Sequence, residues 1–247
     1  MKIAVISDIH GNMEALEAVM SDIQEKGCDK LFVLGDYAMA GPEPKLAIEY
    51  FMNKESNPNV EMIQGNTDAM IADYNYEIYD SIKIKAPVMA EALQDDYKQL
   101  GIQEKTFLKN LPIQKEVDVE GIKILLVHGS PRKNNEDILP ETRMEDVEEM
   151  LADVDSQVIV CGHTHIPCGF QTSTKQTVIN VGSVGRPFTS EPKSCYATIT
   201  INNGKCLFEH HFVKYDNNKA ADKLKVRNFW GADKLAATLL NPTERHF

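Results

Sequence analysis

The sequence lacks any hydrophobic run close to the roughly 18 residues that a membrane-spanning helix needs, so we expect no membrane partner. It also lacks a recognisable targeting segment. The apolar stretch from Ile3 to Ile6 is short and is followed almost at once by acidic Asp8, which indicates a strand and not a signal peptide. These absences favour a cytoplasmic protein.

Paired cysteines and positive charge are also scarce. The five cysteines are odd in number and include no C-x-x-C pair, so we expect reduced thiols and no disulfide framework. The 26 Lys and Arg residues are outnumbered by 37 Asp and Glu residues, which gives a formal net charge of -11. This balance argues against duplex nucleic acid as a partner. The negative charge does not exclude a phosphorylated substrate, because bound divalent cations would reverse the local electrostatic potential.

The length of 247 residues suits one domain with embellishments, and we expect a single domain over residues 1–247. Apolar, β-branched segments at residues 2–7, 30–34 and 60–64 are predicted strands. The segments between them have helical periodicity, with apolar residues on one face. This alternation of strand and helix predicts a parallel α/β sheet in the first part of the chain.

The predicted secondary structure changes its pattern twice in the rest of the chain. Residues 69–110 carry no strand signal, and we interpret them as a helical cap inserted into the domain. Residues 113–127 are predicted to form a hairpin, and short alternating strands follow from residue 168 to residue 213. Residues 217–240 form a predicted helical tail. An α/β fold with a hairpin-rich second half follows from this pattern.

Short polar motifs stand where predicted strands end. They read Asp8-Ile9-His10, Gly35-Asp36, Gly65-Asn66-Thr67-Asp68, Val127-His128-Gly129 and Gly162-His163-Thr164-His165. A single Asp after a strand is most often a turn or capping residue. Open α/β sheets, however, place their sites at the carboxyl ends of strands, so all five motifs would converge in space.

Together the motifs offer more ligands than one metal ion takes. The candidate ligands are Asp8, His10, Asp36, Asn66, His128, His163 and His165. Such a set suits two adjacent ions that share a bridging carboxylate, and two-metal sites catalyse in-line displacement at phosphorus. Mixed oxygen and nitrogen ligation fits two divalent transition-metal ions, with Mn²⁺ as the first candidate and Fe, Ni²⁺, Co²⁺ or Zn²⁺ as alternatives. The absence of a cysteine ligand argues against a structural zinc site.

The order D-x-H, G-D, G-N-x-D, H-G, G-H-x-H resembles the calcineurin-like metallophosphoesterase superfamily. The likeness is to its small bacterial and archaeal phosphodiesterases, and it covers roughly residues 1–213. The phrases at residues 7–12, 127–131, 162–167 and 180–185 contribute to it. The resemblance implies a four-layer α/β/β/α sandwich of two mixed sheets with a helical insertion.

The resemblance also implies roles for the motif residues. One ion would be held by Asp8, His10, Asp36 and His165, and the other by Asp36, Asn66, His128 and His163. Asp36 would bridge the two ions, and a hydroxide between them would attack phosphorus in line with the leaving group. Asp36, Asn66, His128 and Asp68 would then be the catalytic residues.

Thr67 departs from the pattern of the superfamily. Many members carry a His after the motif's Asn, where it resembles a general acid for the leaving oxygen. A threonine hydroxyl is far too weak an acid for this task near neutral pH. Asp68 either assists or has an orienting or capping role. Substrates with good leaving groups are therefore expected, which favours phosphodiesters and phosphoanhydrides over alkyl phosphomonoesters.

Three residues are candidates for contact with substrate: Arg186, Asn12 and Thr67. Arg186 follows Gly182-Ser183-Val184-Gly185 and either holds a phosphate oxygen through its forked donors or forms a salt bridge at the rim. Asn12 is also a predicted helix cap. The tyrosines of the helical insertion provide either a base-stacking surface or ordinary packing; they are Tyr74, Tyr76, Tyr79 and Tyr97.

The sequence therefore predicts a two-metal phosphoesterase that hydrolyses phosphodiester bonds in a phosphorylated small molecule or nucleotide. One alternative is a nucleoside polyphosphate hydrolase of the diadenosine tetraphosphate type. An alternative of another class is a non-catalytic scaffold that keeps the fold, although a scaffold has no need of all seven ligands. The exposed helical cap and the apolar strands also permit a homodimer.

Overall fold

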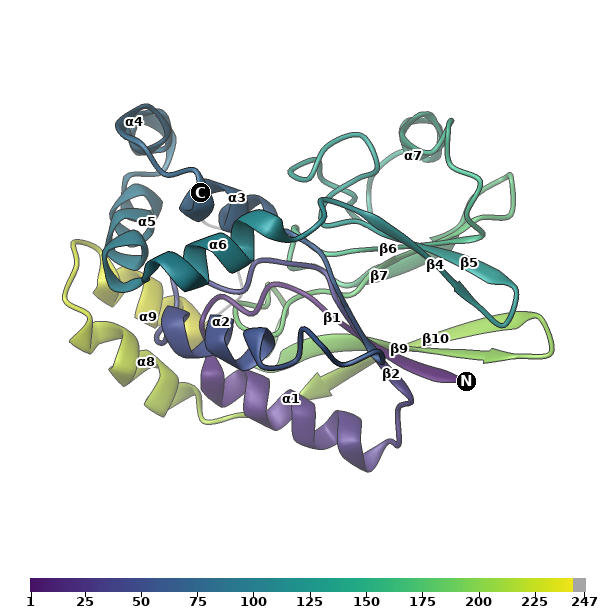
Figure 1. The fold of residues 1–247 in the computed structure, drawn as a ribbon, viewed down its shortest axis with the longest axis horizontal. Coiled ribbons are helices and arrows are strands. Elements are labelled where there is room, and N and C mark those ends of the chain that lie inside the picture. Colours follow the sequence, from purple (N-terminus) through teal and green to yellow (C-terminus); the bar gives the residue numbers. More distant parts are fainter. Residues whose placement is uncertain (242–247) are drawn as a thin grey trace.

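Two mixed sheets lie at the centre of the protein, and the computed structural model describes residues 1–241 of it (Figure 1). The first sheet has the strand order β10-β9-β1-β2-β3. Its strands are β1 (Lys2–Ile6), β2 (Lys30–Val33), β3 (Val60–Met62), β9 (Ser194–Asn202) and β10 (Lys205–Val213). The first three strands are parallel, as the sequence predicts, whereas β9 runs antiparallel to both β1 and β10.

The second sheet has the strand order β4-β5-β6-β8-β7. Its strands are β4 (Lys115–Val119), β5 (Ile122–Leu126), β6 (Val158–Cys161), β7 (Cys168–Gln171) and β8 (Thr177–Asn180). Strands β5, β6 and β8 are parallel, and β4 and β7 pair antiparallel at the two edges. The predicted hairpin is therefore the β4–β5 pair, and it forms one edge of this sheet.

Alternation along the strands builds the layers. In β1, Ile3 and Val5 pack between the two sheets, while Ala4 and Ile6 pack against the helices outside the first sheet. Helices α1 (Met13–Glu25) and α2 (Pro44–Met52) lie on that outer face. Helix α7 (Met144–Met150) covers the outer face of the second sheet. The predicted four-layer α/β/β/α sandwich is confirmed.

Four helices fill the segment that was predicted as a cap. They are α3 (Asn66–Ala72), α4 (Tyr76–Lys85), α5 (Pro87–Gln99) and α6 (Ile102–Asn110). Helix α3 starts at Asn66, so the ligand motif is itself the first turn of a helix and the helical segment begins earlier than residue 69. The backbone N–H of Gly65 at the N-cap donates to Asp68 at 2.8 Å, which fixes this start.

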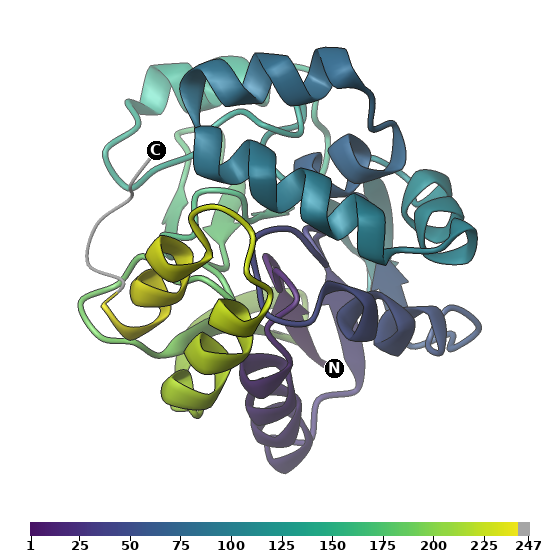
Figure 2. The same cartoon turned by 90° about the vertical axis from the view of Figure 1, so that its left-hand side faces the viewer.

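The tail folds back onto the helices. Helices α8 (Asn217–Val226) and α9 (Ala232–Leu240) pack against each other, and they contact α1 and α5 respectively. Figure 2 shows this tail, in yellow, beside the teal helices of the inserted segment. All five cysteines are free thiols, as expected. Among residues 1–241, no helix combines the length and the apolar character that crossing a membrane requires.

Candidate metal centre

The motif residues meet at the carboxyl ends of strands from both sheets. Asp8 follows β1 and Asp36 follows β2, while Asn66 opens α3 directly after β3. From the second sheet, His128 follows β5, and His163 and His165 follow β6. The two sheets face each other, so these strand ends bring residues more than 150 positions apart in the chain into contact, as the 3.1 Å approach of His165 to Asp8 shows.

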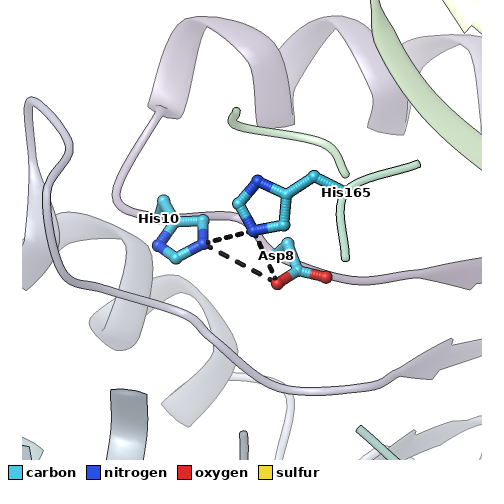
Figure 3. A group of neighbouring side chains, drawn as sticks. All are labelled: Asp8, His10 and His165. Atoms are coloured by element: carbon cyan, nitrogen blue, oxygen red, sulfur yellow. Dashed lines mark hydrogen bonds and ion pairs between the residues drawn. The ribbon is translucent and has the colours of Figure 1, made fainter. Parts of the chain in front are cut away.

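Asp8, His10 and His165 form the first compact set of possible ligands (Figure 3). The Oδ1 atom of Asp8 lies 3.1 Å from Nε2 of His165 and 3.7 Å from Nε2 of His10. The two Nε2 atoms are 3.1 Å apart. All three side chains are buried, and they point toward one another.

Asp8, Asp36 and His128 form the second set. Nε2 of His128 lies 3.4 Å from Oδ2 of Asp36, 3.9 Å from Oδ1 of Asp8 and 2.9 Å from Oδ1 of Asn66. Oδ2 of Asp36 also lies 3.8 Å from Nε2 of His10. Both Asp36 and Asp8 therefore reach imidazoles of both sets, whereas the sequence interpretation gave the bridging position to Asp36 alone.

The backbone of the centre is strained. Five of the seven candidate ligands have a positive φ, between 48° and 66°: Asp8, His10, Asp36, His163 and His165. Residues with a Cβ rarely adopt this conformation, and such strain costs on the order of 1–3 kcal/mol per residue. Backbone hydrogen bonds hold the loops in place, from Asp8 to Gly35 at 3.0 Å and from His10 to Asp36 at 2.9 Å. Strain of this kind clusters at functional sites.

Backbone carbonyls fix the tautomers of three histidines. Nδ1 of His10 lies 2.8 Å from the Met39 oxygen, Nδ1 of His128 lies 2.7 Å from the Leu34 oxygen, and Nδ1 of His165 lies 2.6 Å from the Arg186 oxygen. Because a carbonyl only accepts, each Nδ1 carries the proton and each Nε2 lone pair turns toward the centre. This is the orientation that metal-binding histidines adopt.

The charges of the centre call for a cation. Burial alone would raise the pKa of Asp8, but His165 and His128 hold that pKa well below its usual value. Burial would lower the pKa of His128, yet the carboxylates of Asp36 and Asp8 raise it to about 10, so without an ion a proton occupies the Nε2 lone pair that a metal would take. Oδ1 of Asp8 also finds no hydrogen-bond donor among the described residues. Buried carboxylates, inward lone pairs and an orphaned oxygen fit divalent metal ions as their missing partner.

Comparisons with known proteins identify the family of this chain. A model of the calcineurin-like phosphoesterase superfamily domain matches residues 1–204. The chain belongs to this superfamily. It is also 30% identical over 245 residues to an uncharacterised protein of Methanocaldococcus jannaschii, with 92% of each chain covered. The phosphoesterase family to which the chain belongs supports hydrolysis of phosphoric esters as its general chemistry.

Two solved structures share the fold. A hypothetical protein from Pyrococcus horikoshii OT3 matches with a TM-score of 0.86 and 24% identity, covering 99% of both chains. A metallophosphoesterase from Sphaerobacter thermophilus matches with a TM-score of 0.78 and 24% identity, covering 97% of this chain and 98% of the other. At this level of identity the likeness concerns the fold, and it extends through the inserted helices and the tail.

His163 lies at the edge of this candidate metal centre. Its backbone N–H donates to Oδ2 of Asp8 at 2.9 Å, and its Nε2 atom lies 3.3 Å from Oδ1 of Asp137. The ring packs edge-on against His128, with centroids 5.3 Å apart. The structure thus places the His163 imidazole beside the second set, outside the two compact groups found among residues 1–241. Asp137 was not foreseen, because its loop carries no recognisable motif.

Asp68 lies behind the centre and not in the cavity. Its carboxylate accepts backbone N–H groups from Asp36 and Gly65 at 2.8 Å each and from Tyr37 at 3.0 Å. The side chain is fully buried. It ties the Asp36 loop to the start of α3, a geometry that favours the orienting role over the catalytic one that the sequence left open.

The three candidate substrate residues differ in their surroundings. Both ends of the Asn12 amide are engaged, with the Ala15 N–H at 3.2 Å and the Gly185 carbonyl at 2.9 Å, which is a capping and bracing role. The Thr67 hydroxyl donates to the Ala38 carbonyl at 3.3 Å. Arg186 is 8% exposed, and its Nε finds no hydrogen-bond partner among the described residues.

A cavity of about 220 Å³ lies over the centre. Thr67, Arg186 and the ligand candidates His10, Asp36, Asn66, His163 and His165 line it on one side. Its other walls are apolar and come from Met39, Met70, Ile82, Met89 and Phe188. Phe188 stacks on His165 with ring centroids 5.0 Å apart. Helices α3, α4 and α5 thus cover the centre through Met70, Ile82 and Met89.

Proposed function

We propose that this protein hydrolyses phosphodiester bonds with two divalent metal ions as its cofactors. The observation that carries the proposal is the convergence of three buried imidazoles, their Nε2 lone pairs turned inward, on the carboxylates of Asp8 and Asp36 beneath a cavity. When bound, two such ions supply an activated water for in-line attack and neutralise charge on the phosphoryl oxygens.

The chain's own residues divide the remaining tasks. Asp8, Asp36, His10, His128 and His165 would hold the ions, and Asn66 and His163 would complete the set from the side of His128. The carbonyl acceptors and Asp68 keep these side chains oriented, which is how metal sites are tuned from outside the ligands. This orientation supports a rigid centre that fixes the geometry of attack at phosphorus.

Arg186 and Thr67 bear on the choice of substrate. Arg186 lines the cavity, and its Nε has no hydrogen-bond partner among residues 1–241, so its guanidinium suits a phosphate oxygen. The Thr67 hydroxyl supplies no acid for the leaving oxygen. Diesters with leaving groups of low pKa are therefore the favoured substrates. Phosphoanhydrides share this property, so a nucleoside polyphosphate hydrolase is the second candidate, and a substrate panel separates the two.

The oxygen and nitrogen donors support a transition metal, and Mn²⁺ is the ion that we propose. The test is hydrolysis of bis-p-nitrophenyl phosphate by metal-stripped protein with added Mn²⁺, Fe²⁺, Ni²⁺, Co²⁺ or Zn²⁺. Its aryl leaving group needs no acid. We expect metal-dependent turnover that falls by at least about 100-fold in a His128→Ala variant.

A matched control is His211→Ala. His211 lies on β10 and bonds Thr198 at 2.8 Å, away from the centre, so this variant should keep its turnover. Folded protein that shows no turnover with any of these ions would overturn the phosphodiesterase proposal and favour the scaffold alternative.

A further inference from the structure

A second cavity adjoins the one over the metal centre. It has a volume of about 440 Å³ and lies between the start of α5 and helix α9. The two cavities share Ala86, Met89 and Arg186 as walls. In Figure 2 the yellow helix α9 lies beside the blue-teal α5, and the two helices are in contact. The second cavity therefore lies next to the one over the metal centre, with Met89 and Arg186 at the boundary between them.

The second cavity is large enough for a substituent that the first cannot hold. About 220 Å³ accommodates a phosphoryl group with small substituents, whereas small-molecule sites usually measure about 300–1,000 Å³. The two spaces together reach that range. A ligand that occupied both spaces would have its phosphoryl group over the metal centre and its larger substituent in the second cavity.

Trp230 forms the outer wall of the second cavity. Its side chain is 58% exposed although it lines a cavity, and it is the only Trp of the sequence. Gly231 next to it has a φ of +89°, and a Cβ at this position would lie 2.7 Å from Cγ1 of Val88. Only glycine combines this positive φ with so close an approach to Val88. Gly231 therefore brings the start of α9 against α5 and places the Trp230 indole at the mouth of the second cavity.

Two cationic side chains line this second cavity. Nζ of Lys234 lies 5.5 Å from the centroid of the Trp230 ring, and Arg186 lies at the boundary with the metal cavity. Arg186 is more than nine-tenths buried, its NH1 atom contacts the Met89 sulfur at 3.8 Å, and its Nε has no partner in the described part of the chain. A flat aromatic ligand with a negative charge at one end fits this combination of an indole, a buried guanidinium and an ammonium.

We propose that the cavity between α5 and α9 binds the nucleoside of a nucleotide diester, with its base stacked on Trp230 and its phosphate between Arg186 and the metal centre. This inference rests on the proposed phosphodiesterase function and names its substrate class. The tyrosines of the inserted helices do not take this role. Tyr74 and Tyr97 stack on each other at 4.4 Å, and none of the four lines either cavity.

The first test is fluorescence, because Trp230 is the only indole and reports on this cavity without a metal or turnover. Thymidine 5′-monophosphate should quench the emission of metal-stripped protein in a saturable way. 2-Deoxyribose 5-phosphate, which carries the same sugar and phosphate without a base, should not. Equal responses to both compounds, or no response to either, would overturn base stacking on Trp230.

The second test compares two substrates that release the same p-nitrophenolate, thymidine 5′-p-nitrophenyl phosphate and methyl p-nitrophenyl phosphate. Stacking of one base contributes about 1–3 kcal/mol, so Trp230→Ala should lower the ratio of their kcat/KM values by about 5- to 150-fold. Trp230→Phe, which keeps an aromatic face, should retain most of the ratio. Tyr76 on α4 is another exposed aromatic residue, and Tyr76→Ala should leave the ratio unchanged.

The outcomes separate the two proposals. If wild-type protein cleaves both substrates but Trp230→Ala keeps the wild-type ratio, the nucleoside cavity is wrong and the phosphodiesterase function stands. If neither substrate is cleaved with any metal ion, the phosphodiesterase function fails, and with it the role of the cavity in substrate choice. Quenching by the nucleotide alone, together with a lowered ratio, supports the nucleoside cavity.

Discussion

The Asp68 carboxylate connects two ligand loops without facing the substrate cavity. One of its oxygens accepts the N–H groups of Asp36 and Gly65, and the other accepts that of Tyr37. The N–H of Thr67 in turn donates to Oδ1 of Asp36 at 2.9 Å. Asp36 is therefore oriented from two directions, and a substitution of Asp68 should weaken metal binding.

The Asp68→Asn variant tests this role. An amide NH₂ would face at least one backbone N–H, because all three partners of Asp68 are donors. We expect a loss of about 1–3 kcal/mol in the free energy of unfolding and a fall of about 10- to 100-fold in metal affinity. Urea denaturation and calorimetric titration with Mn²⁺ measure the two effects.

Asp73→Asn is the matched control for this variant, because Asp73 forms an exposed ion pair with Lys109 near the end of α3. Its effect should stay within about 0.5 kcal/mol. Wild-type metal affinity in Asp68→Asn would show that Asp36 keeps its position without the carboxylate.

At the residue scale, the sequence pointed to the side chains of the strand-end motifs but not to their backbone partners. Asp8, His10 and Asp36 could be named because Asp and His at strand ends form a recognisable pattern. The acceptors that fix the histidine tautomers are main-chain oxygens, and every residue has one, so they leave no signal in the sequence. Trp230 was missed because its partner wall, Met89, lies 141 positions away in the chain.

Elements were predictable where periodicity was strong. Helix α1 runs over Met13–Glu25 between two of the predicted strands, and Asn12 is its cap as the sequence predicts. The antiparallel addition of β9 to β1 was not predictable, because long-range strand order depends on packing between distant segments. Side-chain contacts join the helical tail to α1. They include the ion pairs of Lys219 and Lys223 on α8 with Glu14 on α1.

These ion pairs predict how the tail contributes to stability with pH. Burial would raise the pKa of Glu14, but Lys223 and Lys219 outweigh it and lower that pKa from its usual 4.5. A lowered folded-state pKa contributes stability above the unfolded-state value and loses it as the pH falls through the folded-state value. Glu14→Gln should therefore cost about 1 kcal/mol at pH 7, and this difference should shrink below about pH 4.5.

Urea denaturation of wild type and variant at several pH values measures this difference. Glu17→Gln, an exposed neighbour on α1, is the control and should have little effect at any pH. A cost for Glu14→Gln that is equal at pH 7 and pH 3.5 would show that shape, and not charge, joins α8 to α1.

On the scale of the whole molecule, the metal centre connects the two sheets. Asp8, Asp36 and Asn66 come from the ends of first-sheet strands, while His128 and His165 come from the second sheet. The apolar core between the sheets holds them face to face, and the ligands lie at one edge of that core. Ion binding in the folded state would therefore act on the contact between the two sheets.

Metal addition should accordingly raise the melting temperature of the stripped protein. An ion that binds only the folded state, at 100 times its Kd, adds about 2.7 kcal/mol per site. For a chain of this length, about 2–4 °C per kcal/mol gives a rise in Tm of about 5–10 °C per site.

Ca²⁺ should raise Tm less than Mn²⁺, since imidazole nitrogen is a poor ligand for Ca²⁺. In His165→Ala the Mn²⁺ effect should drop by at least half, because one ion loses a buried ligand. If the variant and the wild type gain the same Tm, the stabilising ions lie on the acidic surface and the sheets are held together by their apolar core alone.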